Sequence, residues 1–338
     1  MNGRPLTSLA LLATVVVCIS LLASSAVAQS AWTAPRTADG HPDLQGVWAN
    51  NSATPLERPE AWAGKDSLTD EELADLKYAA ADVVASGADA QFGDQLVLAA
   101  LERIKDADSY DTTGNYNQFW MADRDFSHQT SLVVSPSDGL IPALTSAAVT
   151  RSEVRRASRS DHPADGPEDR GLGERCANFG VPRLSAGYNS YSQIFQSPGS
   201  VVVLKEMAHD AKVIAMDGTP HLNDGIRQWN GDSRGRWDGD TLVIETTNFS
   251  PKSRFRESAE NLHLVERYTR VGPDTLNYEV TIIDPTTWAQ PWSVLIPLRQ
   301  SEDAVFEYAC HEGNYGMEGI LSGHRADEAN GIIPTDVP

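Results

Sequence analysis

The segment RWDGDTLVIETT at residues 236–247 decides the fold, because its pattern returns 34 residues later as RVGPDTLNYEVT at residues 270–281. The two copies share R-x-x-x-D-T-L-x-x-E-x-T, with turn-forming residues ahead of alternating apolar and polar positions. Successive side chains of a strand point to opposite faces, so Leu276, Tyr278 and Val280 are expected on one face. Each copy predicts a turn between two strands. Together they predict a meander of sequence neighbours, and two copies are too few for a propeller or solenoid.

Further short runs rich in β-branched and aromatic residues lie on both sides of this repeat, separated by Gly, Pro, Asn or Asp. Such runs predict strands. The predicted strands are residues 201–204, 212–216, 241–249, 264–271, 276–283, 292–298 and 305–310. Their number and spacing indicate a mainly β fold, an antiparallel β-barrel or a sandwich, and not a parallel α/β sheet.

The first half of the chain has a different pattern. One short strand is expected at residues 44–48, and a cap at Ser67 or Thr69 before an acidic turn predicts a helix that extends to Val84. Helices are also expected at 94–105 and 150–159, and a surface loop at 161–173. We expect residues 29–175 to form a strand and a helical cap packed on the β meander of residues 176–338, in one domain.

The first 28 residues have the order of a cleavable signal peptide. One cation, Arg4, precedes an apolar run from Leu9 to Leu22, and Ala26-Val27-Ala28 follows. The run is shorter than a membrane-spanning helix requires and ends in small residues. We therefore expect a secreted or periplasmic protein without a stable membrane anchor.

The charge of the chain limits its partners. The formal net charge is −20, and removing the signal peptide with its one arginine makes it one unit more negative. Nucleic acids and anionic membranes are bound through clustered Lys and Arg, so neither is an expected partner. We expect a small-molecule ligand or substrate; the oligomeric state stays open.

Two cysteines remain after cleavage, Cys176 and Cys310. Disulfides persist outside the cytoplasm, and we expect these two residues to pair. The chain has no C-x-x-C, so a thioredoxin-like motif and a zinc ribbon are not expected.

Four segments carry a resemblance to a known family: PDLQGVW at 42–48, GLGERC at 171–176, WDGDTLVIETTNF at 237–249 and YACHEGNY at 308–315. They resemble a family of secreted proteins of Gram-negative bacteria, and the similarity spans nearly the whole mature chain. This resemblance implies export. In addition, Gly46-Val47-Trp48 resembles the G-x-W of the first strand of lipocalin-like (calycin) barrels, which implies a barrel with an interior pocket.

No G-x-S-x-G, P-loop, H-E-x-x-H or dinucleotide motif is present, so catalytic candidates must come from polar clusters near strands. Glu266 falls on the leucine face of its predicted strand, and a buried acid with a raised pKa can act as an acid or base. Histidines near neighbouring acids suit general base chemistry. The candidate catalytic residues are His209, His263, Glu266 and His311, and the candidate substrate-binding residues are His221, Arg234, Arg267, Tyr278 and Glu312.

Structural roles compete with these assignments. Asp, Ser and Gly around Arg234 are typical of a turn, and a histidine at a strand end can bond to backbone. His209, His221, His263 and His311 are a minor candidate set for a transition metal, because no two have a spacing that makes convergence visible. No organic cofactor is expected.

The favoured hypothesis is an exported enzyme that moves a proton on a small, partly apolar molecule in a barrel pocket. Its reaction would be that of a lyase, isomerase, hydratase or hydrolase. Charged residues within the strands favour this over the alternative, a non-catalytic periplasmic binding protein, whose cavity would be mainly apolar. A structural envelope protein is the third hypothesis.

Overall fold

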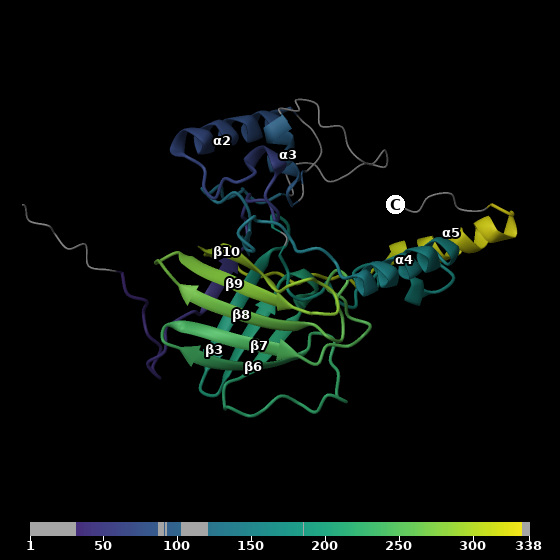
Figure 1. Ribbon diagram of the computed structural model, residues 1–338. Coiled ribbons are helices and arrows are strands. Elements are labelled where there is room, and N and C mark those ends of the chain that lie inside the picture. Colours follow the sequence, from purple (N-terminus) through teal and green to yellow (C-terminus); the bar gives the residue numbers. More distant parts are fainter. Residues whose placement is uncertain (1–31, 87–90, 92, 103–120, 185, 333–338) are drawn as a thin grey trace, which may run out of the picture. The chain divides into compact units, whose positions relative to one another are not determined.

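A ring of nine strands closes the sheet of this protein (Figure 1). The computed structural model describes residues 32–86, 91, 93–102, 121–184 and 186–332. The ring contains β1 (Gly46–Ala49), β3 (Tyr191–Ser197), β4 (Ser200–Lys205), β5 (Ala211–Ala215), β6 (Asp232–Asp238), β7 (Thr241–Thr247), β8 (His263–Arg270), β9 (Thr275–Ile283) and β10 (Trp292–Ser301). A short tenth strand, β2 (Val133–Ser135), also pairs with β10. The prediction of a mainly β barrel is confirmed, and closure excludes the sandwich.

The two copies of the sequence repeat form the meander that they predict. The first copy contains the end of β6, a turn and β7, and the second contains the end of β8, a turn and β9. These strands pair antiparallel with their sequence neighbours, for example Leu242 with Tyr268 and Tyr268 with Tyr278. Leu276, Tyr278 and Val280 are buried on one face, as the alternation predicts.

One junction of the ring departs from the expected antiparallel pattern. β5 and β6 run parallel and share a single residue pair, Ala215 with Arg234. The long connection between them, residues 216–231, allows the chain to re-enter the sheet in the same direction. A hairpin turn could not do so. The barrel is therefore mixed, though mostly antiparallel.

The closing strand is β1. Its Val47 pairs with Gln193 of β3 on one side and with Ser301 of β10 on the other. Trp48 is fully buried, and its indole Nε1 donates to the carbonyl oxygen of Leu44 at 2.8 Å. This closed barrel, with a buried G-x-W tryptophan on the closing strand, is compatible with a calycin-like architecture.

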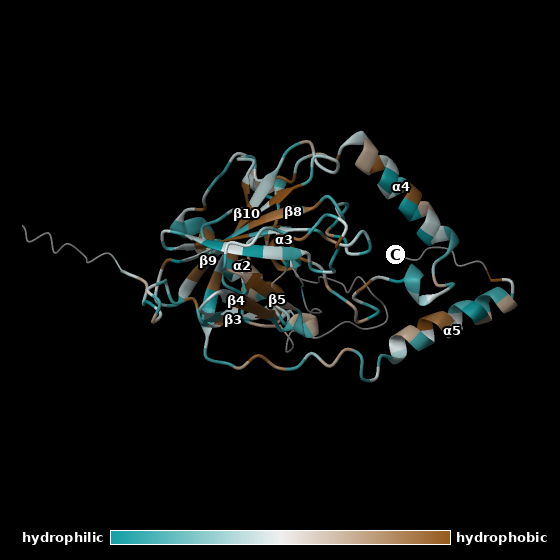
Figure 2. Cartoon of the chain, turned by 90° about the horizontal axis from the view of Figure 1, so that it is seen from below, coloured by the Kyte–Doolittle hydropathy of each residue, from teal (hydrophilic) through white to brown (hydrophobic). Residues whose placement is uncertain are grey.

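Apolar side chains fill the barrel. One cluster of buried residues contains Trp48, Ile194, Val203, Ile214, Leu242, Ile244, Leu264, Leu276, Tyr278, Ile282, Trp292 and Ile296, among others. In Figure 2 the hydrophobic colour concentrates on the strands, whereas α2 and α4 carry hydrophilic stretches. The ring thus has its own continuous core.

Helices α2 (Asp70–Ala85) and α3 (Gln95–Glu102) form where the sequence predicts them. Thr69 and Glu72 make a capping box, in which the Thr69 side chain accepts from the Glu72 N–H and the Glu72 carboxylate accepts from the Thr69 N–H. A second apolar cluster, including Trp62, Leu73, Val83, Leu96 and Val97, joins the two helices. Predicted residues 103–105 lie outside the described part of the chain.

The remaining helices differ from the sequence predictions. α4 (Ser146–Asp161) begins four residues earlier than expected, because Thr145 caps it by accepting from the N–H of Ala148 at 3.1 Å. α5 (Tyr315–Ala329) was not predicted, and residues 305–310 form no strand. Three short 3-10 helices complete the described elements: η1 (Glu60–Trp62), η3 (Pro167–Asp169) and η4 (Met207–His209).

The predicted disulfide is confirmed. Cys176 and Cys310 are bonded, with their Cα atoms 5.5 Å apart, and join segments 134 residues apart in the sequence. Within the described residues, no helix combines the length and the apolar character that crossing a membrane requires. The predicted signal peptide lies outside the described residues.

Candidate functional site

A buried ion pair lies inside the barrel. The Lys212 ammonium on β5 contacts the Glu266 carboxylate on β8, and their side chains are 8% and 1% exposed. Tyr278 donates to the other carboxylate oxygen at 2.9 Å, and the Tyr268 ring stacks on the Tyr278 ring with centroids 4.7 Å apart. We call Lys212, Thr246, Glu266, Tyr268 and Tyr278 the interior cluster. Because side chains alternate between the two faces of a strand, these polar groups lie on the same inward face as the apolar core residues.

The electrostatics of the interior cluster keep Glu266 ionised. Burial by itself would raise the pKa of Glu266, but the charge of Lys212 and its hydrogen bond lower this pKa below the usual value. Burial and the nearby Glu266 charge raise the pKa values of Tyr268 and Tyr278 well above the ordinary tyrosine value. Glu266 therefore has the opposite pKa shift from the one expected of a general acid, and it acts here as a hydrogen-bond acceptor.

Lys205 is a less satisfied cation at the end of β4. Burial lowers the pKa of Lys205 to about 8; Glu266 opposes this shift, and the charges of Lys212 and Arg183 add to it. In the described residues no hydrogen bond or ion pair of the Lys205 ammonium is found. A partly buried amine with a lowered pKa is more readily deprotonated than an ordinary lysine.

The predicted histidines do not gather around Glu266. His209 and His311 are exposed, and His263 begins β8 with a buried Nε2 that has no hydrogen-bond partner in the part of the chain that the structure describes. Glu312, next to the disulfide, is exposed as well. Within the described ranges, no hydrogen bond or ion pair connects these residues to Glu266. The carboxylate thus has lysine, tyrosine and threonine as its neighbours.

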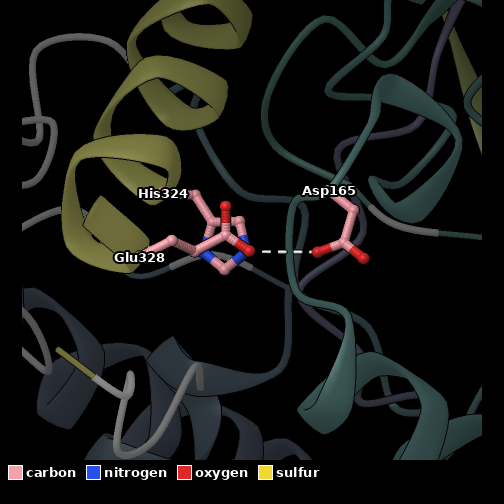
Figure 3. A group of neighbouring side chains, drawn as sticks. All are labelled: Asp165, His324 and Glu328. Carbon is pink, nitrogen blue, oxygen red and sulfur yellow. Dashed lines mark hydrogen bonds and ion pairs between the residues drawn. The ribbon is translucent and has the colours of Figure 1, made fainter. Parts of the chain in front are cut away.

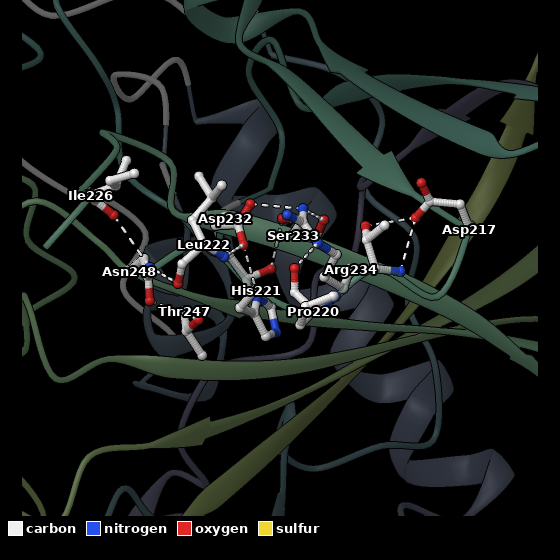
Figure 4. Close-up of polar contacts among 12 residues, drawn as sticks. Asp217, Pro220, His221, Leu222, Ile226, Asp232, Ser233, Arg234, Thr247 and Asn248 are labelled. Carbon is white, nitrogen blue, oxygen red and sulfur yellow. Dashed lines mark hydrogen bonds and ion pairs between the residues drawn. The ribbon is translucent and has the colours of Figure 1, made fainter. Parts of the chain in front are cut away.

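His221 and Arg234 meet at Asp232, as Figure 4 shows. Asp232 accepts from Arg234 Nη1 at 2.7 Å and from the Leu222 N–H at 3.0 Å, and its Oδ2 lies 2.9 Å from His221 Nδ1. Although burial opposes it, these hydrogen bonds and charges lower the pKa of Asp232. The Asn248 amide nearby donates to three carbonyl oxygens of the same long connection. This network anchors the β5–β6 connection to the barrel, which favours the structural role for Arg234.

The other two predicted binding residues lie on opposite faces of the barrel wall. Arg267 is partly exposed and pairs with Asp238 at 3.1 Å, whereas Tyr278 belongs to the interior cluster. The structure therefore brings Glu266 together with Tyr278, and His221 with Arg234, but forms no single site from the predicted set.

A different group of residues has the arrangement of metal ligands. Asp165, His324 and Glu328 place ligand atoms within 4.8 Å of one another (Figure 3). His324 Nε2 lies 3.2 Å from Asp165, and His162 approaches the other Asp165 oxygen at 2.7 Å. The four predicted histidines form no such group among the described residues. The two carboxylates are exposed, and they lie 3.2 Å (Asp165) and 3.8 Å (Glu328) from His324 Nε2.

A cavity of about 380 Å³ lies against the barrel core, between residues 52–56, the start of α3, and residues 124, 132 and 255. Its apolar walls include Leu56, Leu98, Leu132, Leu184 and Phe255. Three of these, Leu56, Leu184 and Phe255, pack directly on the barrel core. Its volume lies in the usual range for small-molecule sites. We call it the Arg124 cavity.

Arg124 lines this cavity and carries buried hydrogen-bond donors without a partner among the described residues. Its Nη2 donates to the carbonyl oxygens of Ser52 and Gly93, at 3.0 and 2.7 Å. Its Nε and Nη1 are buried and have no partner in the described part of the chain. Gly187 leaves room for this side chain, because a Cβ there would lie 2.5 Å from Nη1. Unpaired buried donors are costly, so they favour an acidic ligand group at this position.

Asp94 faces the same cavity. Its carboxylate accepts from the Leu56 N–H at 3.1 Å. Burial raises the pKa of Asp94, and the Leu56 hydrogen bond and the Arg124 charge only partly offset this effect. Burial also lowers the pKa of Arg124, which Asp94 opposes. A carboxyl group with a raised pKa, near an arginine with free donors, is suited to proton transfer as well as to binding.

Sequence reasoning missed both residues. Asp94 was assigned only to a helix start, and Arg124 lies in an irregular segment where no periodicity marks it. Lys212 was detectable by the argument used for Glu266, since it shares its strand face with Ile214.

Comparisons with models of protein families, with curated proteins and with solved structures return no match to this chain. The site therefore has to be interpreted from its own geometry.

The interior ion pair gives a testable prediction. Glu266→Leu should lower the free energy of unfolding by about 3–5 kcal/mol, because it leaves the Lys212 charge buried without a partner. Adding Lys212→Met should recover much of this loss. Urea unfolding of both single variants and the double variant measures the coupling. Additive effects of the two substitutions would contradict the proposed dependence of one charge on the other.

Lys205 gives a prediction of pH dependence. Below pH 8 the Lys205 ammonium is charged in both the folded and the unfolded protein, and its burial destabilises the folded state. As the pH rises from about 8 toward the ordinary lysine pKa, the folded state loses this proton first and the destabilisation disappears. Lys205→Met should therefore stabilise the protein at pH 7 and much less at about pH 10. Thermal unfolding, with the exposed Lys77→Met as control, tests this; a pH-independent difference would contradict it.

Proposed function

We propose that this protein binds a small, partly apolar molecule through an acidic group, in the Arg124 cavity. The observation that carries the proposal is the pair of buried Arg124 donors, Nε and Nη1, which have no partner in the described residues and lie beside apolar walls. A ligand carboxylate would satisfy both donors at once. The apolar part of the ligand would contact Leu56, Leu98 and Phe255.

The barrel interior is less suited to this role than the Arg124 cavity. Core side chains and the interior cluster occupy the barrel interior, and Lys212 and Glu266 already neutralise each other. A ligand entering there would have to displace well-packed groups, at a cost of several kcal/mol. We therefore place the expected ligand pocket outside the barrel interior, in the Arg124 cavity, which irregular segments form against the barrel core.

The binding proposal is tested with matched ligands on the mature protein. Small aromatic and medium-chain carboxylic acids should bind in calorimetry, and their primary amides should bind at least tenfold more weakly. Arg124→Gln should weaken acid binding about 10- to 100-fold, since charged hydrogen bonds are worth about 1.5–3 kcal/mol. Arg236→Gln, an exposed site outside the cavity, is the control. Equal binding of acids and amides would overturn the proposal.

Acid–base catalysis on the same ligand is the second candidate function, and the raised pKa of Asp94 favours it. Because neutral Asp94 leaves the Arg124 charge unopposed, ligand affinity should rise as the pH falls through this pKa. As a base, Asp94 would take a proton from a ligand carbon and return one from solvent. In this candidate function Asp94 replaces Glu266 and the predicted histidines as the proton-transfer group, and no histidine belongs to the lining of the Arg124 cavity.

The two candidates differ in one measurement. If Asp94 transfers protons, ligand C–H groups should exchange with deuterium when the complex is incubated in D₂O and followed by NMR. Asp94→Asn should abolish this exchange, remove the pH dependence of affinity and retain binding. An absence of exchange in the wild-type protein, with acids still bound, would leave binding alone as the function.

A further inference from the structure

A second cavity, of about 570 Å³, lies away from the barrel core and is lined by cations from three segments. α4 contributes Arg155 and Arg159, the loop after it contributes Arg170 and Arg175, and residues 252–256 contribute the rest. We call it the arginine cavity. Seven of the 27 Lys and Arg residues of this strongly acidic chain line it, which a solvated surface with evenly mixed charges would not produce.

Three of these cations are neutralised within the protein. Arg155 pairs with Glu257, Arg170 pairs with Glu174 at 2.6 Å, and Arg175 holds Glu168 through two contacts of 2.9 and 3.1 Å. The remaining acid of the lining, Asp169, accepts from the Gly166 N–H at 2.8 Å. The carboxylates that line the cavity are therefore already engaged.

Four cations of the lining have no such partner. In the described residues, the side chains of Arg159, Lys252, Arg254 and Arg256 form no hydrogen bond or ion pair. Burial lowers the pKa of Arg254, the charges of Arg155 and Arg159 lower it further, and the Glu257 charge only partly offsets these effects. Like charges that converge repel one another, and an anion between them relieves this repulsion.

The wall of the cavity is braced. Cys176 follows Arg175 and is bonded to Cys310, and the Asn314 side chain donates to the Glu174 carbonyl oxygen at 2.9 Å. Arg170 also donates from Nη1 to the Pro163 carbonyl oxygen at 3.0 Å, while its buried Nε has no partner among the residues that the structure describes. At least part of the cationic wall is thus held in position before any ligand arrives.

We propose that the arginine cavity binds the phosphate group of a small molecule. A phosphate offers several oxygens to guanidinium groups that approach from different segments, and its double charge suits four unneutralised cations better than a carboxylate does. The cavity is larger than a phosphate ion, so it also accommodates the body of the molecule, against Leu172 and the exposed Phe179 ring. This site is separate from the Arg124 cavity, although Arg256 lines both.

The test uses pyrophosphate as the soluble probe and the full mature protein. Calorimetry should detect binding that weakens with salt, and Arg254→Gln or Arg159→Gln should each reduce the affinity about tenfold or more. Arg299→Gln, an exposed site outside the cavity, should bind as wild type does. Equal binding by all variants would overturn the proposal.

Two further measurements make the result decisive. Phenylglyoxal modification, mapped by peptide mass spectrometry, should be slower at Arg254 when pyrophosphate is present, which tests the wild-type protein without any substitution. Sedimentation with phosphatidylcholine vesicles, with and without phosphatidic acid, identifies a lipid headgroup as the source if only vesicles containing phosphatidic acid bind. If neither pyrophosphate nor these vesicles bind, the cavity is not a phosphate site.

Discussion

Closure of the barrel by β1 is the constraint on which the rest of the structure depends. This strand has four residues, yet it pairs with β3 on one side and with β10 on the other, and both partners follow it by more than a hundred residues along the chain. Without it, the sheet would have two free edges, which proteins avoid because unpaired backbone groups associate with other chains. Trp48 on this strand is fully buried, so the strand that closes the barrel also fills part of its core.

A closed and filled barrel restricts where charged groups can function. Inside it, Lys212 and Glu266 are tolerated because each satisfies the other and Tyr278 occupies the second carboxylate oxygen. Such a pair contributes to a defined interior and offers no free group to a ligand. Among the described residues, buried polar groups without a hydrogen-bond partner occur in irregular segments, as at Arg124 and Arg170, and also on strands, as at His263 and Trp292. We propose binding chemistry in the irregular segments that cover the barrel, because loops commonly carry function.

The two cavities differ in character but are not electrostatically independent. The Arg124 cavity combines apolar walls with Asp94 and one buried guanidinium, whereas the arginine cavity is strongly cationic. Arg256 lines both, with a backbone in the left-handed region at φ 53°. By Coulomb's law, an anion in either cavity lowers the positive potential in the other. The chain therefore has a local concentration of positive charge at the arginine cavity, although its net charge is negative.

Local patterns in the sequence determined much of the fold. The repeat at 236–281 predicted the meander, Thr69 with its acidic turn predicted the start of α2, and the two cysteines predicted their disulfide. The meander and the helix start depend on neighbours in the chain, where side-chain periodicity and capping act directly. The disulfide joins residues 134 apart and followed from the number of cysteines and the expected export. Even the burial of Glu266 and Tyr278 followed from the period of two. Strand β3 was missed, and β6 followed only from the turn of the first repeat copy, because the residues of both strands are largely polar and their pairing comes from the adjoining strands.

Only the tertiary structure decided which side chains meet. Ring closure, the parallel β5–β6 junction, the Lys212–Glu266 contact and both cavities join residues from distant segments, and no local period encodes such distances. The pKa shifts belong to the same class, since Lys212 reversed the shift expected for Glu266, and burial beside the core produced the raised value of Asp94. The sequence by itself determined the elements and the faces they bury. Burial and long-range charge, which exist only after folding, decided where the chemistry resides.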